Sequence, residues 1–144
     1  MKIALAADHG GFELKEKVKV YLLDKGYEVL DLGSDNGEIS VDYPNYGKLC
    51  GETVVKGEAD KGIVVCGTGI GISIAANKVK GIRCALCTNV FMAEMASKHN
   101  NANILSLGGR VLDTELALEI VHTWLTTEFE GGRHQTRVDM LDCI

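Results

Sequence analysis

The sequence predicts an α/β fold in which a parallel sheet of five strands is covered by helices on both faces. Short apolar runs alternate with longer amphipathic stretches, the pattern of repeated β-α units. The apolar runs are nearly continuous instead of alternating with polar residues, which indicates strands buried on both faces. Hydrophobic residues make up 46% of the 144 residues, so a single domain over residues 1–144 can bury a sizeable core.

The first half of the chain is expected to contain three strands and two helices. The strands correspond to the apolar runs Lys2–Ala7, Glu28–Leu32 and Lys61–Cys66. Gly11–Lys25 has apolar residues near helical spacing and is followed by Gly26, which ends helices readily. After a polar loop, a second helix is expected over Asp42–Lys56, because Pro44 suits a first helical turn.

The second half continues the same alternation. Two further strands are expected at Arg83–Cys87 and Ile104–Leu107. Three helices are expected, the first running from the glycine-rich loop to about Lys80, the others over Asn89–Asn100 and Asp113–Thr127. Asn89 and Asp113 are good capping residues for the last two. The tail from Arg133 should add one or two helical turns.

Composition excludes several classes of protein. The net charge of −5 argues against a nucleic-acid binder, which usually presents a basic face. No apolar stretch approaches the ~20 residues of a membrane helix, and the apolar run at the N-terminus is too short for a signal peptide. We therefore expect a soluble, cytoplasmic protein with neither nucleic acid nor membrane as a partner.

The five cysteines are expected to be reduced thiols, because their number is odd and their spacing is not that of a small secreted scaffold. Cys84 and Cys87 form a C-x-x-C pair inside an apolar run. Residues three apart on a strand point to opposite faces. The pair should therefore not hold a metal, and structural cysteines are the expectation there.

Polar or glycine-rich residues follow four of the predicted strands. In open α/β sheets ligands bind at the carboxyl ends of the strands, so these residues should face one crevice. They are Asp8 and His9 after the first strand, Cys66 and its glycine loop after the third, Thr88 and Asn89 after the fourth, and Gly108, Gly109 and Arg110 after the fifth.

The central motif is Cys66-Gly67-Thr68-Gly69-Ile70-Gly71, which leads from a strand into a helix. The glycines allow backbone N–H groups to approach a ligand, and the helix N-terminus favours a thiolate and other anions. A base beside an oxyanion hole is what aldose–ketose isomerisation requires. A tight turn with a buried cysteine is an equally good explanation of this motif alone. A dinucleotide site is disfavoured, because such loops usually follow the first strand.

Histidines and arginines outside this motif are weaker candidates. His9 stands at a strand end, whereas His99 at a helix C-terminus is more typical of a favourable dipole partner. His122 should be solvated. Arg133 and Arg137 are four apart, so a helical turn would place both on one side, where two guanidinium groups suit a phosphate. A solvated tail explains the arginine pair as well.

Several motifs together resemble those of the type B ribose-5-phosphate isomerases over essentially the whole chain. They are Ala6-Ala7-Asp8-His9-Gly10-Gly11, Asp42-Tyr43-Pro44, Cys66-Gly67-Thr68-Gly69-Ile70-Gly71, Ala75-Ala76-Asn77-Lys78, Ser97-Lys98-His99-Asn100, Leu107-Gly108-Gly109-Arg110 and Arg133-His134-Gln135-Thr136-Arg137. The resemblance implies a Rossmann-like three-layer fold and a homodimer, or a dimer of dimers, with active sites at the subunit interface. It also implies interconversion of ribose 5-phosphate and ribulose 5-phosphate in the non-oxidative pentose phosphate pathway.

The resemblance further implies roles for individual residues. Cys66 would be the proton acceptor, Thr68 would help position it, and His99 would donate the proton that opens the furanose ring. The sugar phosphate would contact Asp8, His9, Tyr43, Gly67, Thr68, Gly69, Ile70, Gly71 and Asn100. Arg133, Arg137 and His9 resemble the phosphate grip, and Arg110 resembles a residue that reaches the site from the partner subunit. The resemblance implies no metal and no organic cofactor.

Three alternatives remain open from the sequence. The chain resembles galactose-6-phosphate isomerase subunits, which work as two different chains. Within the main prediction, allose 6-phosphate is a further candidate substrate and does not count as one of the three alternatives. A phosphocysteine carrier of sugar transport also places a cysteine at a strand end, although usually after the first strand of a shorter chain. A sugar-phosphate sensor without catalysis is the third alternative, and the presence of both a candidate base and a candidate acid argues against it.

Overall fold

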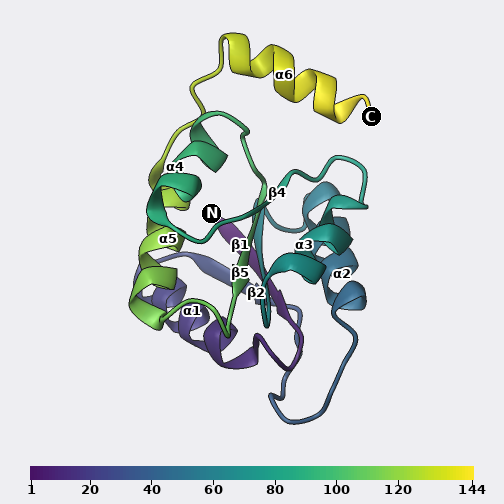
Figure 1. Cartoon of the computed structure of the whole chain (residues 1–144), viewed down its shortest axis with the longest axis vertical. Coiled ribbons are helices and arrows are strands. Elements are labelled where there is room, and N and C mark those ends of the chain that lie inside the picture. Colours follow the sequence, from purple (N-terminus) through teal and green to yellow (C-terminus); the bar gives the residue numbers. More distant parts are fainter.

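The computed structural model describes residues 1–144 and confirms a sheet of five parallel strands (Figure 1). The strands are β1 (Lys2–Ala7), β2 (Glu28–Asp31), β3 (Lys61–Cys66), β4 (Cys84–Leu86) and β5 (Ile104–Gly108). The helices are α1 (Phe12–Asp24), α2 (Tyr43–Val55), α3 (Ile70–Asn77), α4 (Val90–Lys98), α5 (Thr114–Thr126) and α6 (Arg133–Asp142). No helix is both long and apolar enough to cross a membrane.

Helices cover both faces of the sheet, which gives the expected three layers. Buried side chains of α1, α4 and α5 form one apolar cluster with the sheet, and those of α2 and α3 form the other. Successive residues of a strand point to opposite faces, so Leu5 joins the first cluster and Ala6 the second. Burial on both faces explains why the strands are nearly continuous apolar runs.

The strand order is β2-β1-β3-β5-β4, so β3 lies at the centre and β4 at one edge. In the register between β3 and β5, Cys66 lies opposite Gly108. The loops that follow these two strands therefore start side by side. This register brings the glycine loop and Arg110 to the same place at the carboxyl edge of the sheet.

The predicted helix caps are confirmed. The Asn89 side chain accepts a hydrogen bond from the backbone N–H of Met92 at 2.8 Å. Asp113 does the same for Leu116 at 2.8 Å. Each cap satisfies one of the N–H groups that a helix N-terminus leaves without a partner.

Two helix predictions were wrong in length. The helix expected to reach Lys80 ends at Asn77, because the Asn77 amide turns to the backbone of Cys84. Asn77 accepts from the Cys84 N–H at 2.7 Å and donates to the Cys84 carbonyl at 3.0 Å, as a neighbouring strand would. The tail forms a helix of ten residues, α6, and not one or two turns. His134 and Val138 are the side chains that this helix buries.

The cysteines behave as expected for reduced, structural thiols. All five are free, and Cys84 and Cys87 pack on opposite faces of the sheet. Burial raises the pKa of Cys50 to about 12 and that of Cys87 to about 11, so both thiols stay protonated at neutral pH. Neither Cys84 nor Cys87 belongs to a group of neighbouring potential metal ligands.

A buried lysine ties α1 to the end of β2. The side chain of Lys15 is 1% exposed, and its Nζ lies 2.7 Å from Asp31 Oδ1. Lys19 contacts the other carboxylate oxygen at 3.0 Å, and the Gly33 N–H donates to Oδ1 at 3.0 Å. Burial alone would raise the pKa of Asp31, but the hydrogen bonds from Lys15, Gly33 and Lys19 outweigh it and lower that pKa.

This ion pair predicts a stability difference that depends on pH. Asp31→Asn should lower the free energy of unfolding by about 2–4 kcal/mol at pH 7, because it leaves the buried Lys15 charge without its closest partner. The lowered pKa means that the carboxylate stabilises the fold above its unfolded-state pKa. The difference should shrink as acid protonates Asp31 in the wild type. Urea unfolding at a series of pH values measures it.

The matched control is Glu16→Gln. Glu16 also contacts Lys15 Nζ, at 3.1 Å, but its side chain is 42% exposed. Its loss should cost less than about 1 kcal/mol. Equal effects of the two substitutions would contradict the importance assigned to the Asp31 pair.

Candidate active site

Backbone hydrogen bonds join the loops that follow β1, β3 and β5. The N–H of Asp8 donates to the Val65 carbonyl at 3.3 Å. The N–H groups of Gly109 and Arg110 donate to the carbonyls of Cys66 and Gly67 at 2.8 and 2.9 Å. These bonds hold the three loops together at the carboxyl edge of the sheet, where the sequence predicted a crevice.

The Cys66 sulfur lies at the N-terminus of α3. Its residue is 5% exposed, and the Gly69 N–H donates to Sγ at 3.1 Å. An N–H that points at a sulfur stabilises the thiolate, and the positive end of the helix dipole adds to the effect. The geometry therefore suits a thiol that takes up and returns a proton.

Position 69 excludes a side chain for two reasons. Its φ is +80°, in the left-handed region that favours glycine. A methyl group there would lie 2.7 Å from Leu86 Cδ1 and 2.9 Å from the carbonyl carbon of Leu107. Ser106, within β5, fixes the same residue because its hydroxyl donates to the Gly69 carbonyl at 2.6 Å. The amide that faces Cys66 is thus held rigidly.

The remaining polar groups of this edge are also fixed. Asp8 is buried, and its Oδ1 accepts from the Gly11 N–H at 3.1 Å. His9 Nδ1 accepts from the Val41 N–H at 3.2 Å, which leaves the imidazole proton of the neutral ring on Nε2. The ring of Tyr43, at the start of α2, packs against Gly71 of α3.

Arg110 lies across the crevice of its own chain. A methyl group at Gly10 would come 3.3 Å from its Cζ, and one at Gly67 would come 3.2 Å from its Nη1. Its side chain helps line a cavity of about 430 Å³ together with His9, Phe12 and Glu38. The resemblance implied that this arginine reaches a site from a partner subunit, whereas here it contacts the glycine loops of its own chain.

Four other predicted residues lie at the opposite edge of the sheet. Each helix runs back against the preceding strand, so the C-terminal end of α4 brings His99 and Asn100 to the amino edge. The Nε of Arg83, which precedes β4, donates to the Asn100 carbonyl at 3.1 Å. Arg133 and Arg137 are exposed on α6, which lies at that same end of the molecule (Figure 1).

The site residues therefore form two groups. A strand of six residues such as β3 spans roughly 20 Å, which is longer than a five-carbon sugar phosphate. One chain alone cannot bring both groups to one such ligand in this conformation. At the carboxyl edge, His9 and Arg110 line one cavity, and backbone hydrogen bonds join the loops that carry Asp8, Cys66 and Arg110.

Comparison with known proteins identifies the family. The ribose/galactose isomerase family matches residues 3–141 of this chain. The chain belongs to this family.

Relatives of this isomerase-family chain align along nearly their whole length. Ribose-5-phosphate isomerase B of Escherichia coli is 46% identical over 143 residues, which cover 99% of this chain and 95% of the relative. The structure of the Clostridium thermocellum isomerase B is 57% identical with a TM-score of 0.97, covering 99% and 95% of the two chains. That of Mycoplasma genitalium, with bound ribulose-5-phosphate, is 40% identical with a TM-score of 0.95, covering 99% and 94%.

Sequence reasoning missed two groups that shape these sites. Ser106 looked like one residue of an apolar strand, and only the strand register shows that its hydroxyl reaches the Gly69 carbonyl. His134 was assigned no role from the sequence, and the structure buries it against His99. The sequence signal that could have indicated its burial was a histidine between two arginines on one short helix, where the three side chains cannot all share one side.

The crowding at Gly69 predicts a loss of stability. Gly69→Ala should lower the free energy of unfolding by about 2–4 kcal/mol, since strain and a steric clash add. The control is Gly57→Ala, at φ +76° with no atom within 4 Å of the added methyl group. It should cost only about 1 kcal/mol, from the backbone alone. Similar urea midpoints for the two variants would disprove the close packing around Gly69.

Proposed function

We propose that this chain is an aldose–ketose isomerase that interconverts D-ribose 5-phosphate and D-ribulose 5-phosphate through an enediolate. The observation that carries the proposal is the Cys66 sulfur, which receives the Gly69 N–H at the N-terminus of α3. Family membership supports it, as do relatives named ribose-5-phosphate isomerase B, one of them solved with ribulose-5-phosphate.

In the proposed reaction Cys66 is the base. Its thiolate removes the proton from C2 of the open-chain aldose, and the electron pair of that bond forms the C1=C2 double bond of the enediolate. The thiol then returns the proton to C1, while the oxygen on C2 gives up its proton to that on C1 and becomes the ketone. The Gly69 and Ile70 N–H groups already donate to Cys66 and Thr68, so the other backbone N–H groups of loop 67–71 stabilise the charge on the oxygens.

The carboxyl edge supplies the sugar-binding half of the proposed site. Asp8 offers a carboxylate to the hydroxyl groups, and Tyr43 lines the pocket beside the glycine loop. His9 presents an N–H, because its other nitrogen is occupied by Val41. Arg110 adds a positive charge from the same chain. Thr68 accepts a hydrogen bond from the Ile70 N–H at 3.2 Å, which helps to hold the loop around the base.

We place the other half of the site on a second copy of the chain. In this arrangement His99 and Asn100 of the partner face the sugar, and the partner's Arg133 and Arg137 join His9 on the phosphate. His99 donates a proton to the furanose ring oxygen as the bond from C1 to that oxygen breaks. The hydroxyl on C1 releases its proton to water, which gives the aldehyde that Cys66 acts upon.

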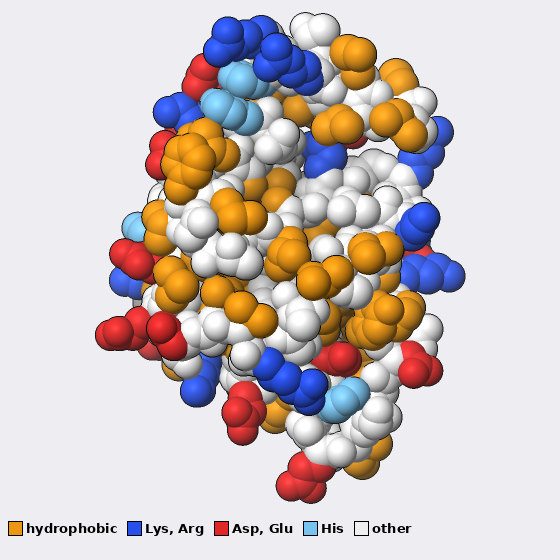
Figure 2. All heavy atoms as spheres, in the orientation of Figure 1, with side chains coloured by type: hydrophobic (Ala, Val, Ile, Leu, Met, Phe, Trp, Pro, Cys, Tyr) orange, Lys and Arg blue, Asp and Glu red, His pale blue; other side chains and the backbone are white.

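The surface of the monomer supports this homodimer. The face in Figure 2 carries basic and histidine side chains at both ends and apolar side chains between them. The exposed apolar residues of the chain include Ile70 and Ile74 of α3, Phe91 of α4, and Met140 and Leu141 of α6. A cavity of about 440 Å³ hollows the same region between the edge strand β4 and α6. A two-fold axis across this face would bring the amino edge of one chain to the carboxyl edge of the other.

The proposed steps need only side chains and backbone amides, so they require neither a metal nor an organic cofactor. We propose the cytoplasm as the location, since five free thiols fit a reducing compartment. We also propose that residues 1–144 act as one domain.

Turnover by the purified chain in the presence of a chelator tests the proposed base. The wild type should form ribulose 5-phosphate from ribose 5-phosphate. Cys66→Ala should lower kcat by about a thousandfold, because the base is lost. Cys143→Ala, which removes an exposed thiol outside the site, should match the wild type. Normal turnover by Cys66→Ala would exclude it as the base. Turnover only of galactose 6-phosphate, with a second chain present, would favour the two-chain isomerase.

A mixing experiment tests whether each site is shared between two chains of the dimer. Cys66→Ala and His99→Asn should each be nearly inactive alone. After the two are unfolded and refolded together, half of the dimers are mixed, and each contains one intact site. Activity should therefore recover to about a quarter of the wild-type value.

Two variants of the same half provide the control. A mixture of Cys66→Ala with Asp8→Ala should stay inactive, since every mixed dimer carries one substitution in each site. Equal recovery in both mixtures would contradict the proposed division, as would no recovery in either.

A further inference from the structure

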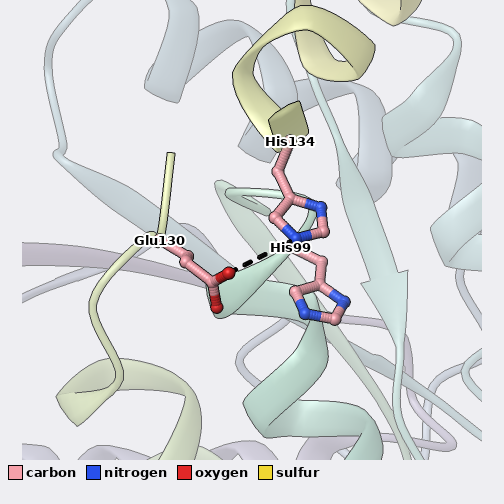
Figure 3. A group of neighbouring side chains, drawn as sticks. All are labelled: His99, Glu130 and His134. Atoms are coloured by element: carbon pink, nitrogen blue, oxygen red, sulfur yellow. Dashed lines mark ion pairs between the residues drawn. The ribbon is translucent and has the colours of Figure 1, made fainter. Parts of the chain in front are cut away.

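Two histidines from different helices stack face to face at the amino edge of the sheet (Figure 3). The ring centroids of His99 and His134 are 4.0 Å apart, and the planes differ by 11°. His99 directly follows α4, and His134 lies in the first turn of α6. His134 is 5% exposed and is one of the two side chains that α6 buries, the other being Val138.

The cluster also contains Glu130, whose Oε1 lies 3.6 Å from His134 Nε2. Potential ligand atoms of the three residues lie within 4.8 Å of one another, which at first suggests a metal site. A histidine binds a metal through a lone pair in the plane of its ring. The planes of two rings that lie 4.0 Å apart and differ by 11° meet only far from the rings, so a bound metal cannot lie in both planes. The geometry is that of a stacked pair and does not suit a chelate.

The surroundings disfavour the charged form of His134. Burial lowers the pKa of His134, and His99, Arg133 and Arg137 lower it further, while Glu130 acts in the opposite direction. The Nε2 of His134 faces Glu130 but has no hydrogen-bond partner, since 3.6 Å is too long for a hydrogen bond. The flat face of the His134 ring fixes the plane of the His99 ring and stabilises positive charge on that ring.

We propose that His134 is a positioning residue that holds the His99 ring flat in the orientation needed to protonate the furanose oxygen. This inference rests on the proposed function and assigns no contact between His134 and the sugar. The stack lies within one chain, so the proton donor and the arginines of α6 would reach the partner's site as one rigid group. His134 therefore acts on ring opening through His99, whereas the arginines act on phosphate binding.

The test compares two apolar substitutions, of which only one keeps a flat ring. His134→Phe preserves the stack and His134→Leu fills the space without it. With ribose 5-phosphate as substrate, His134→Leu should lower kcat by about tenfold or more, because the donor ring is no longer aligned. His134→Phe should retain most of the wild-type kcat. KM should change little in both variants, since Arg133 and Arg137 stay in place.

The KM value separates positioning from a merely structural role. If His134 only anchors α6, its replacement should displace both arginines and raise KM in both variants together. The reverse reaction adds a second criterion. Ribulose 5-phosphate has no free hydroxyl on C5 to close a furanose ring, so exchange of its C1 proton with D₂O bypasses ring opening. This exchange should stay near the wild-type rate in His134→Leu.

His122→Ala, on the exposed side of α5, is the control and should behave as the wild type. Normal kcat in His134→Leu, equal losses in the Leu and Phe variants, or an equal loss of proton exchange would each overturn the positioning role. If the wild type itself forms no ribulose 5-phosphate, the proposed function fails first and the inference with it. A normal wild type beside normal variants refutes the inference alone.

Discussion

The direction of the strands is the constraint on which the rest of the structure depends. Because all five strands run the same way, every loop after a strand reaches one edge and every helix returns to the other. Cys66 ends a strand and His99 follows a helix, so the two lie at opposite edges of the sheet within one chain. The parallel sheet thus explains why three loops meet at the carboxyl edge, where backbone hydrogen bonds join them. It also explains why Arg133 and Arg137 lie far from that edge.

Within that frame, the groups that hold the Cys66 sulfur and its hydrogen-bond donor in place do not titrate. The Gly69 N–H, the Ser106 hydroxyl and the register between β3 and β5 fix the position of the sulfur and its donor. Fixed dipoles need no reorganisation when charge develops, which is the advantage that such a site has over water. In the proposed mechanism the base relies on the geometry of the fold, while Asp8, His9 and Tyr43 hold the sugar.

Much of the fold and part of the site followed from the sequence. Continuous apolar runs and the caps at Asn89 and Asp113 are local signals, and the structure confirms them. The end of α3 depends on the Asn77 amide pairing with Cys84, a contact between segments whose proximity no local pattern reveals. The stack of His99 on His134 likewise needs α6 in place. The family resemblance supplied roles for His99 and Arg110 that spacing alone could not.

The anchoring of α6 has a consequence for how the substrate range can change during evolution. This helix buries only His134 and Val138, while its two arginines face solvent. Substitutions on its outer side leave the sheet and the cysteine loop untouched. In the proposed dimer, selection for a longer or shorter sugar phosphate can therefore act on α6 while the proton-transfer machinery at the opposite edge stays as it is.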